Sequence, residues 1–432
     1  MDGTLLIYGS YGYTGDLITR RAVDDGATPI VAGRRAEPLE EQATEFELDH
    51  QAFSLTHPDI IESSIADVDA VLNCAGPFSG TAEPLIDACL ETGTNYLDIA
   101  GRVEVLESIA ERDREAETAD VTLLPGVGFD VVPTDCLAAI LNAKLPETEH
   151  LTLALDGLEN FSPGTVKSII ESVNRPSAMR EDGEIQSVSP AWQSREFDFG
   201  SGEQTGVMVP WGALSTAYYS TGIGTIETYA TVPQAAVRSM RYGTAVTPIL
   251  TFGPIQQLLL YATDCLVSGP TQDERIQSTT RLFGEVTNGA GDRATARLTT
   301  PGIYDVTAAT AVESARRVLS DEVESGFQTP SSAFGADFIT EFDGVTQRSE
   351  RSPEGYSPDP SPEDSNRSSF SPVANQTICP TGFVRTHSSR NQRCVRRPLA
   401  NKRTHQRYQR RRPRPCIESK DRPTFHAVLV ER

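Results

Sequence analysis

Short apolar runs alternate with longer amphipathic segments along the first part of the chain. The apolar runs have the length of strands, and the segments between them have the length and spacing of helices. Strands that alternate with helices in this way indicate a parallel, doubly wound sheet. We therefore predict strands over Thr4–Tyr8, Pro29–Ala32, Gln51–Leu55, Ala70–Asn73, Asn95–Ile99 and Val121–Leu124, with the first two helices over Thr14–Asp25 and Glu37–Glu47.

The pattern changes after Pro125, where a turn rich in Gly and Pro leads into a helical segment around Thr134–Asn142. Longer polar stretches with isolated strand patterns follow, which indicates a mixed α+β domain. Tyr304–Leu319 has the spacing of a strand followed by a helix and is a candidate to pack back on the first domain. The predicted fold class is α/β. We expect a Rossmann domain over 1–130, an α+β substrate or dimerisation domain over 131–346, and a tail over 347–432. Residues 304–346 of the second domain are expected to pack back on the first.

Charge also divides the chain near residue 346. Residues 1–346 contain 20 basic and 52 acidic residues, a formal net charge of −32, with only two lysines. This composition is typical of halophilic proteins from cells with multimolar internal salt, and it disfavours binding of nucleic acid or anionic lipid. No signal-peptide pattern follows Met1, and the body cysteines lack metal-site spacing. We expect a cytoplasmic protein without a metal, and a homodimer is left open.

Residues 347–432 contain 18 basic and 8 acidic residues and are rich in Ser, Pro and Arg. Such a composition cannot bury enough apolar surface to fold alone, so we expect a disordered basic tail. Two interpretations of this tail compete. It is either an extension left by a changed reading frame or stop codon, or an arm that binds nucleic acid. The apolar stretch Val246–Gly269 is interrupted by Pro248, Pro254 and Asp264, which restricts any membrane contact to a peripheral one. We expect a buried or dimer-interface helix there instead.

Three glycines follow the first predicted strand at intervals of three residues. The first allows a tight turn, the second lets the backbone approach a diphosphate, and the third lets the helix pack on the strand. The diphosphate then lies at the positive end of the helix dipole. This part of the predicted cofactor site comprises Gly9, Ser10, Tyr11, Gly12, Tyr13, Thr14 and Gly15.

Arg34 and Arg35 follow the second predicted strand, where an NAD-binding protein has an acidic residue for the ribose 2′-hydroxyl. Two guanidinium groups suit a 2′-phosphate, so the sequence favours NADP(H) over NAD(H). The alternative is a pair of exposed arginines at the start of a helix. The fourth predicted strand ends in a small-residue turn at the expected ligand crevice, and this turn adds Asn73, Cys74, Ala75, Gly76 and Pro77 to the cofactor site.

Six ordered motifs resemble the saccharopine dehydrogenase-like oxidoreductase family, in particular its trans-acting enoyl reductase-like branch. They are YGSYGYTG, AGRR, LNCAGPF, TNYLDIAG, PGVGFDVVPTD and TPSSAFGADF, and the resemblance spans about residues 3–345. It implies an NAD(P)-dependent oxidoreductase, here with NADP(H), that transfers hydride to or from a small or lipid-like substrate at a C=C, C=N or C=O bond. The substrate itself is not identified.

The chain departs from this branch after TNYLDIAG, where the branch has Glu and this chain has Arg102. A non-catalytic nucleotide-binding or redox-sensing protein that retains the Rossmann site is therefore the alternative function. The candidate catalytic residues in the crevice segments are Tyr96, Asp98 and Asp130. Helix capping competes with catalysis for Asp130 and for the nearby Thr134 and Asp135. Ser162, Gly164 and Thr165 precede a helical pattern and predict an N-cap, with binding of an anionic substrate group as the alternative.

Overall fold

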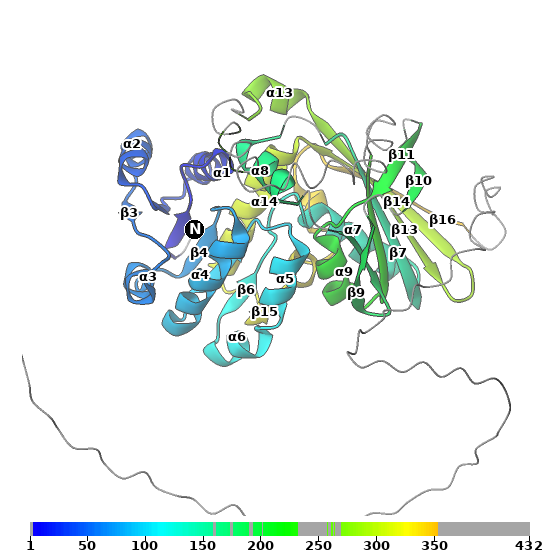
Figure 1. Ribbon diagram of the computed structural model, residues 1–432, viewed down its shortest axis with the longest axis horizontal. Helices are drawn as coiled ribbons and strands as arrows, with labels where there is room; N and C mark the ends of the chain where they lie inside the picture. The colour runs from blue at the N-terminus through cyan, green and yellow to red at the C-terminus, as the bar shows by residue number, and fades with distance from the viewer. Residues whose placement is uncertain are drawn as a thin grey trace, which may run out of the picture. The chain divides into compact units, whose positions relative to one another are not determined.

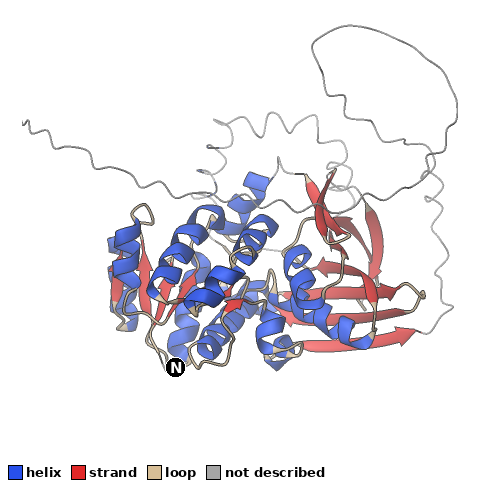
Figure 2. Ribbon diagram, turned by 90° about the horizontal axis from the view of Figure 1, so that it is seen from below, coloured by secondary structure: helices blue, strands red, loops and turns tan. Residues whose placement is uncertain are grey.

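The computed structural model describes residues 3–352 except 159–160, 173–175, 190–192, 201 and, apart from Gln257, Tyr261 and Thr263, 232–268. Most of the apolar stretch Val246–Gly269, and the tail beyond Ser352, therefore lie outside the described residues. The described chain contains two β-sheets with helices packed against them (Figures 1 and 2). Among its helices, none is long and apolar enough to cross a membrane.

Sheet A has seven parallel strands in the order β15-β6-β5-β4-β1-β2-β3. Because β1 lies between β2 and β4, the strand order reverses beside it, and ligands bind at such a switch point. This arrangement confirms the predicted Rossmann fold. The strands are β1 Leu5–Tyr8, β2 Ile30–Gly33, β3 His50–Ala52, β4 Ala70–Asn73, β5 Asn95–Asp98, β6 Thr122–Leu124 and β15 Gly326–Phe327.

Different helices cover the two faces of sheet A. They are α1 Tyr13–Asp24, α2 Ala36–Phe46, α3 Pro58–Ile65, α4 Phe78–Thr92, α5 Val103–Ala110, α6 Asp113–Ala119 and α14 Ile303–Val318. Leu5 and Ile7 of β1 pack with buried residues of α1 and α14, whereas Leu6 and Tyr8 pack with buried residues of α3 to α6. Successive strand side chains point to opposite faces, so β1 must be apolar throughout, as its sequence is.

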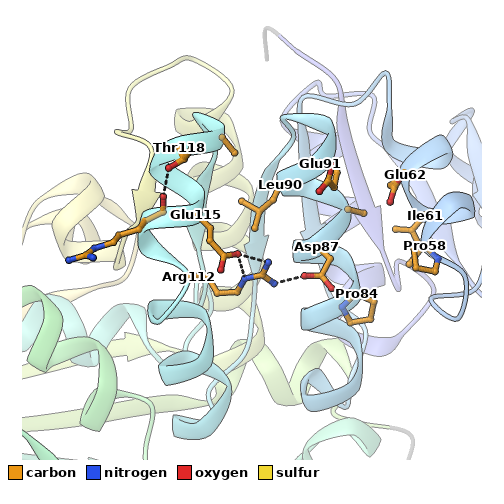
Figure 3. Close-up of a pocket in the computed structure, with 13 residues that line it drawn as sticks. Pro58, Ile61, Glu62, Pro84, Asp87, Leu90, Glu91, Arg112, Glu115 and Thr118 are labelled. Carbon is orange, nitrogen blue, oxygen red and sulfur yellow. Dashed lines mark hydrogen bonds and ion pairs between the residues drawn. The ribbon is translucent and has the colours of Figure 1, made fainter. Parts of the chain in front are cut away.

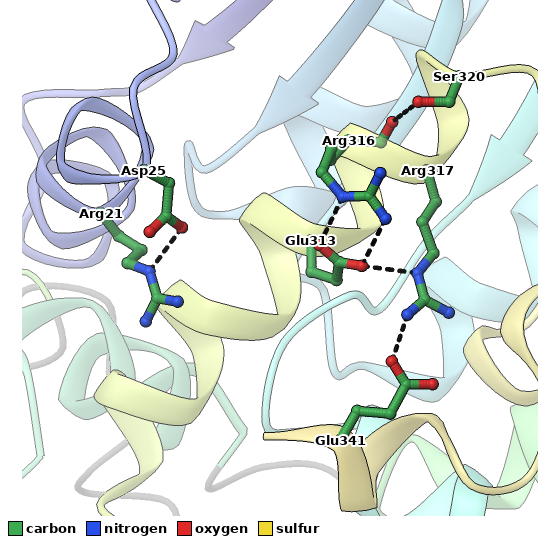
Figure 4. Close-up of polar contacts among 7 residues, drawn as sticks. All are labelled: Arg21, Asp25, Glu313, Arg316, Arg317, Ser320 and Glu341. Carbon is green, nitrogen blue, oxygen red and sulfur yellow. Dashed lines mark hydrogen bonds and ion pairs between the residues drawn. The ribbon is translucent and has the colours of Figure 1, made fainter. Parts of the chain in front are cut away.

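Helix α14 corrects the prediction of a strand followed by a helix over Tyr304–Leu319, because the whole segment is helical. The β-branched Thr307 and Thr310 suggest a strand, but their hydroxyls donate to the carbonyls four residues earlier and fit the helix. At its end, Glu313 accepts hydrogen bonds from Arg316 and Arg317, and Arg317 also pairs with Glu341 (Figure 4). These ion pairs hold the end of α14 against the 3-10 helix η2, Phe338–Glu341.

Sheet B forms the predicted second, mixed α+β region. Its main path runs β10-β11-β12-β7-β13-β14-β16, with the hairpin β8-β9 attached to β12. Among the described strand pairs of this sheet, β7-β12 is parallel and the others are antiparallel. Helices α7 Val132–Lys144 and α9 Ala213–Thr221 pack on it and form a large apolar core. The strands are β7 Thr148–Asp156, β8 Ser177–Glu181, β9 Glu184–Val188, β10 Ser194–Asp198, β11 Glu203–Met208, β12 Thr225–Thr231, β13 Thr279–Asn288, β14 Arg293–Pro301 and β16 Thr346–Ser352; the other helices are α8 Pro163–Ser172, α13 Gln272–Gln277 and α15 Pro330–Phe334.

Strand β16 shows that sheet B continues past the boundary predicted at 346. It pairs with β14 in antiparallel register from Thr346 to Ser352. An edge strand has hydrogen-bonded neighbours on one side only and tolerates polar side chains, so its sequence, TQRSERS, carries no apolar pattern. The predicted start of the tail at residue 347 is therefore too early.

Candidate nucleotide-binding and catalytic site

The turn after β1 is closed by glycine contacts that a side chain would obstruct. Gly9 has a φ of +84°, and its N–H donates to the Ala32 carbonyl at 2.7 Å. A Cβ at Gly9 would lie 2.8 Å from the Ala75 nitrogen, and one at Gly15 would collide with the Gly9 carbonyl oxygen. The first and third glycines therefore allow β1, α1 and the end of β4 to approach closely, as the motif predicts.

Gly12 is the N-cap residue of helix α1 and leaves the first turn of the helix without a side-chain cap. It is extended, with φ −72° and ψ 161°, and it provides no side-chain hydrogen bond to cap the helix. A Cβ added here would meet the Gly9 carbonyl oxygen at 3.2 Å. Helix N-termini carry partial positive charge and unpaired amides. In addition, the buried Ser10 hydroxyl has no hydrogen-bond partner within the described residues. These features fit a bound diphosphate.

Arg34 and Arg35 lie exposed at the end of β2, beside the glycine-rich turn. The Arg35 guanidinium lies 4.9 Å from the centroid of the Tyr11 ring. The Tyr11 ring packs so closely on Gly33 that a Cβ there would lie 2.6 Å from it. Tyr11 and the two arginines thus form a cationic edge that suits an adenosine 2′-phosphate.

The turn after β4 is fixed by the buried Asn73 side chain. Its Oδ1 accepts from the Ala75 N–H at 3.0 Å, and its Nδ2 donates to the Tyr96 hydroxyl at 3.1 Å. Because Ala75 contacts Gly9, this turn borders the glycine-rich turn. Pro77 is the N-cap residue of α4. Burial raises the pKa of the Cys74 thiol, which disfavours a thiolate there.

Tyr96 and Asp98 are buried in hydrogen bonds that join the ends of β5 and β6. The Tyr96 hydroxyl donates to Asp98 at 2.9 Å, and the second Asp98 carboxylate oxygen accepts from the Ala100 and Gly126 N–H groups at 2.9 and 3.0 Å. Burial raises the pKa of both side chains. Both are completely buried, so this geometry suits holding the crevice turns in place better than exchanging protons with a substrate.

Asp130 follows a loop that α14 holds against sheet A. The Phe129 N–H donates to the Thr307 hydroxyl at 3.0 Å, and the Thr310 hydroxyl donates to the Val127 carbonyl at 2.7 Å. The Asp130 side chain is solvent-exposed, yet the protein mass around it displaces enough water to raise the carboxyl pKa to about 6. An accessible carboxyl with this pKa can take up or release a proton near neutral pH.

Loops from both sheet regions meet near Asp130. A Cβ at Gly101 would lie 2.5 Å from the Asp130 carboxylate, and a Cβ at Gly212, in the loop before α9, would lie 3.2 Å from the Gly101 carbonyl oxygen. Arg102, next to Gly101, is 17% exposed and lies 3.7 Å from Glu104. The unusual Arg102 is therefore adjacent in sequence to the residue that contacts Asp130.

The predicted capping roles near α7 are wrong. Helix α7 begins after Val131 without a side-chain cap. Asp135 lies inside the helix, completely buried, and accepts from the Ser220 hydroxyl at 2.8 Å and the Ser331 N–H at 2.7 Å. It thus fastens α7 to α9 and α15, while Asp130 remains outside the helix.

Tyr13 connects the glycine-rich turn with the second part of the chain. Its hydroxyl donates to the Pro270 carbonyl at 2.6 Å, and its ring meets the Tyr304 ring edge-on at 5.0 Å. The Tyr304 hydroxyl accepts from the Ser162 N–H at 2.6 Å, and the Ser162 hydroxyl accepts from the Thr165 N–H at 3.3 Å. Ser162 therefore caps α8, as expected, and Tyr304 links this cap to Tyr13 of the glycine-rich turn, a contact that the sequence pattern did not reveal.

A separate pocket of about 680 Å³ lies among α3, α4 and α6 (Figure 3). Arg112 crosses it and donates to Asp87 and Glu115. None of the predicted site residues lines this pocket, so it is distinct from the candidate nucleotide site.

Comparison with known proteins agrees with this geometry. Residues 5–124 match the saccharopine dehydrogenase NADP-binding domain. The chain is 27% identical over 213 residues to human saccharopine dehydrogenase-like oxidoreductase. The aligned part covers 43% of this chain and 49% of that protein. It is 27% identical over 208 residues to a putative trans-acting enoyl reductase of Mycobacterium tuberculosis, with coverage of 43% and 49%. The chain thus spans about half the length of these relatives.

The fold is also similar to that of apo saccharopine dehydrogenase (L-Glu forming) from Saccharomyces cerevisiae. The TM-score is 0.54 at 12% identity, with 81% of this chain and 100% of that chain covered. At this identity the likeness concerns the fold. The matches confirm the predicted resemblance to saccharopine dehydrogenase-like oxidoreductases, the Rossmann fold and NADP(H) as the cofactor of the N-terminal domain.

Proposed function

We propose that this protein is an NADP(H)-dependent oxidoreductase that transfers hydride to or from a small or lipid-like substrate at a C=C, C=N or C=O bond. The observation that carries the proposal is the grouping of an open glycine-rich turn, a cationic edge and an accessible carboxyl at the carboxyl ends of the strands of one sheet. Ligands of doubly wound sheets bind at that edge. The names of the relatives support an oxidoreductase.

The residues divide into binding and chemical roles. The turn Gly9–Gly15 would hold the diphosphate, Arg34 and Arg35 the 2′-phosphate, and the turn Asn73–Pro77 the nicotinamide side of the cofactor. When bound, NADP(H) supplies or accepts the hydride. Asp130 would give or take the accompanying proton, because the residue is exposed and desolvation by the surrounding protein raises the pKa of its carboxyl to about 6.

Arg102 and the internal hydrogen bonds of Tyr96 and Asp98 favour one alternative, a nucleotide-binding protein without catalysis. The two functions separate in an assay of NADPH oxidation with an enoyl thioester, an imine and a ketone. We expect wild type to oxidise NADPH with one of these classes, and Asp130→Asn to bind NADPH with unchanged affinity but lose most of the turnover. Tight NADPH binding without turnover in any class would support the alternative.

A further inference from the structure

The buried side chain of Gln42 joins the two parts of the nucleotide site that sequence patterns identify separately. Gln42 is 5% exposed and lies on α2, the helix that begins directly after Arg34 and Arg35. Its Nε2 donates to the Ser10 carbonyl of the glycine-rich turn at 3.1 Å and to Asp16 Oδ1 in the first turn of α1 at 3.1 Å.

This contact has a defined orientation. Both partners of Gln42 Nε2 are hydrogen-bond acceptors, so a flipped amide would place Oε1 against two oxygen atoms and lose both bonds. The Asp16 carboxylate is shared with Arg20, whose Nε lies 2.8 Å from it, and Arg20 also contacts Glu45 of α2 at 2.9 Å. The Arg20 pairs are largely exposed and contribute little, whereas the Gln42 bond to Ser10 is buried and the bond to Asp16 is partly buried.

We propose that Gln42 is a positioning residue for the cofactor, which fixes α2 against the glycine-rich turn so that the 2′-phosphate and the diphosphate are bound together. The proposal rests on the proposed function. One nucleotide spans the 2′-phosphate site and the diphosphate site, so the distance between the two sites must match the distance between these groups in the cofactor. The two Gln42 bonds set that separation, because one end of α2 carries the arginines and Gln42 contacts the turn directly. Gln42 would not touch the cofactor.

The test is the affinity of the purified full chain for NADPH and for NADH, measured by fluorescence titration at matched salt. Gln42→Met keeps the side-chain length but removes the donor, and Gln42→Leu removes the donor with a shorter apolar side chain and no added charge. We expect each to weaken NADPH binding about tenfold, about 1.4 kcal/mol, and NADH binding by less. Thr44→Val, which removes a hydrogen bond to Glu40 on the exposed part of the same helix, should leave both affinities unchanged.

A purely structural role of Gln42 would lower the melting temperature without changing the ratio of NADPH to NADH affinity. A wild-type ratio in either folded Gln42 variant would therefore overturn the inference while leaving the proposed function intact. In a background of Arg34→Ala with Arg35→Ala, the Gln42 variants should cause no further loss of preference, and a further loss would also contradict it. Wild type that binds no nicotinamide nucleotide would overturn the inference and the proposed function together.

Discussion

Replacing Thr307 by Val tests whether α14 positions the loop that carries Asp130. The substitution keeps the volume and β-branching of the side chain but removes the hydroxyl that accepts the hydrogen bond from the Phe129 N–H at 3.0 Å. That bond is buried, so the amide is left without its acceptor. A buried unsatisfied donor costs about 1–3 kcal/mol, and Tm falls by about 2–4 °C per kcal/mol in a domain of this size class.

The assay compares thermal unfolding of wild type, Thr307→Val and Ser320→Ala. Ser320 makes an exposed hydrogen bond to the Arg316 carbonyl at the end of the same helix, and its loss should change Tm little (Figure 4). We also expect Thr307→Val to reduce turnover while NADPH affinity stays near wild type, because the loop bearing Asp130 moves and the glycine-rich turn does not. If Thr307→Val unfolds at the same temperature as Ser320→Ala, the hydroxyl does not support this loop and the reasoning fails.

Three further predictions concern the site and the chain end. Gly12→Val should abolish NADPH binding in a folded protein, measured by titration and circular dichroism, because a side chain at the second glycine would occupy the space of the diphosphate; undiminished binding would make the motif a simple turn. The free energy of unfolding of Asp130→Asn should increase relative to wild type as the pH rises from about 4 to about 6. The raised pKa means that the folded state disfavours ionised Asp130, so wild type loses stability over this range and the variant does not. A difference in urea unfolding that is independent of pH would contradict this. A chain that ends at Asp359 should keep the wild-type Tm, whereas one that ends at Val345 lacks β16 and should unfold at a lower temperature; equal Tm values would show that β16 contributes nothing.

The sequence predicts sheet A well, because parallel strands buried on both faces are apolar over their whole length. Leu5–Tyr8 and Ala70–Asn73 are almost entirely apolar and are bounded by turns. The glycine-rich turn is predictable for a related reason: Gly9 and Gly15 occupy positions where a Cβ collides with the backbone or with Ala75. Local steric requirements of this kind leave a local sequence signal.

The features that the sequence did not reveal depend on contacts between distant residues. Tyr304 and Thr307 look like strand residues until their helix packs on α1 and on the loop before Asp130. Asp135 lies near a helix start and resembles a cap, but its carboxylate serves Ser331, far along the chain. Gln42 gives one weak signal, a polar residue on the buried side of an amphipathic helix, and only the fold shows that it contacts Ser10.

We infer that Arg34 and Arg35 complete an NADP(H) site formed with the glycine-rich turn. The most direct measurement is the ratio of the dissociation constants for NADH and NADPH in wild type and in the variant with Arg34→Ala and Arg35→Ala, at matched salt. We predict that wild type binds NADPH at least about tenfold more tightly, equivalent to about 1.4 kcal/mol, and that the double variant loses this preference. Equal affinities in wild type, or an unchanged preference in the variant, would contradict the assignment.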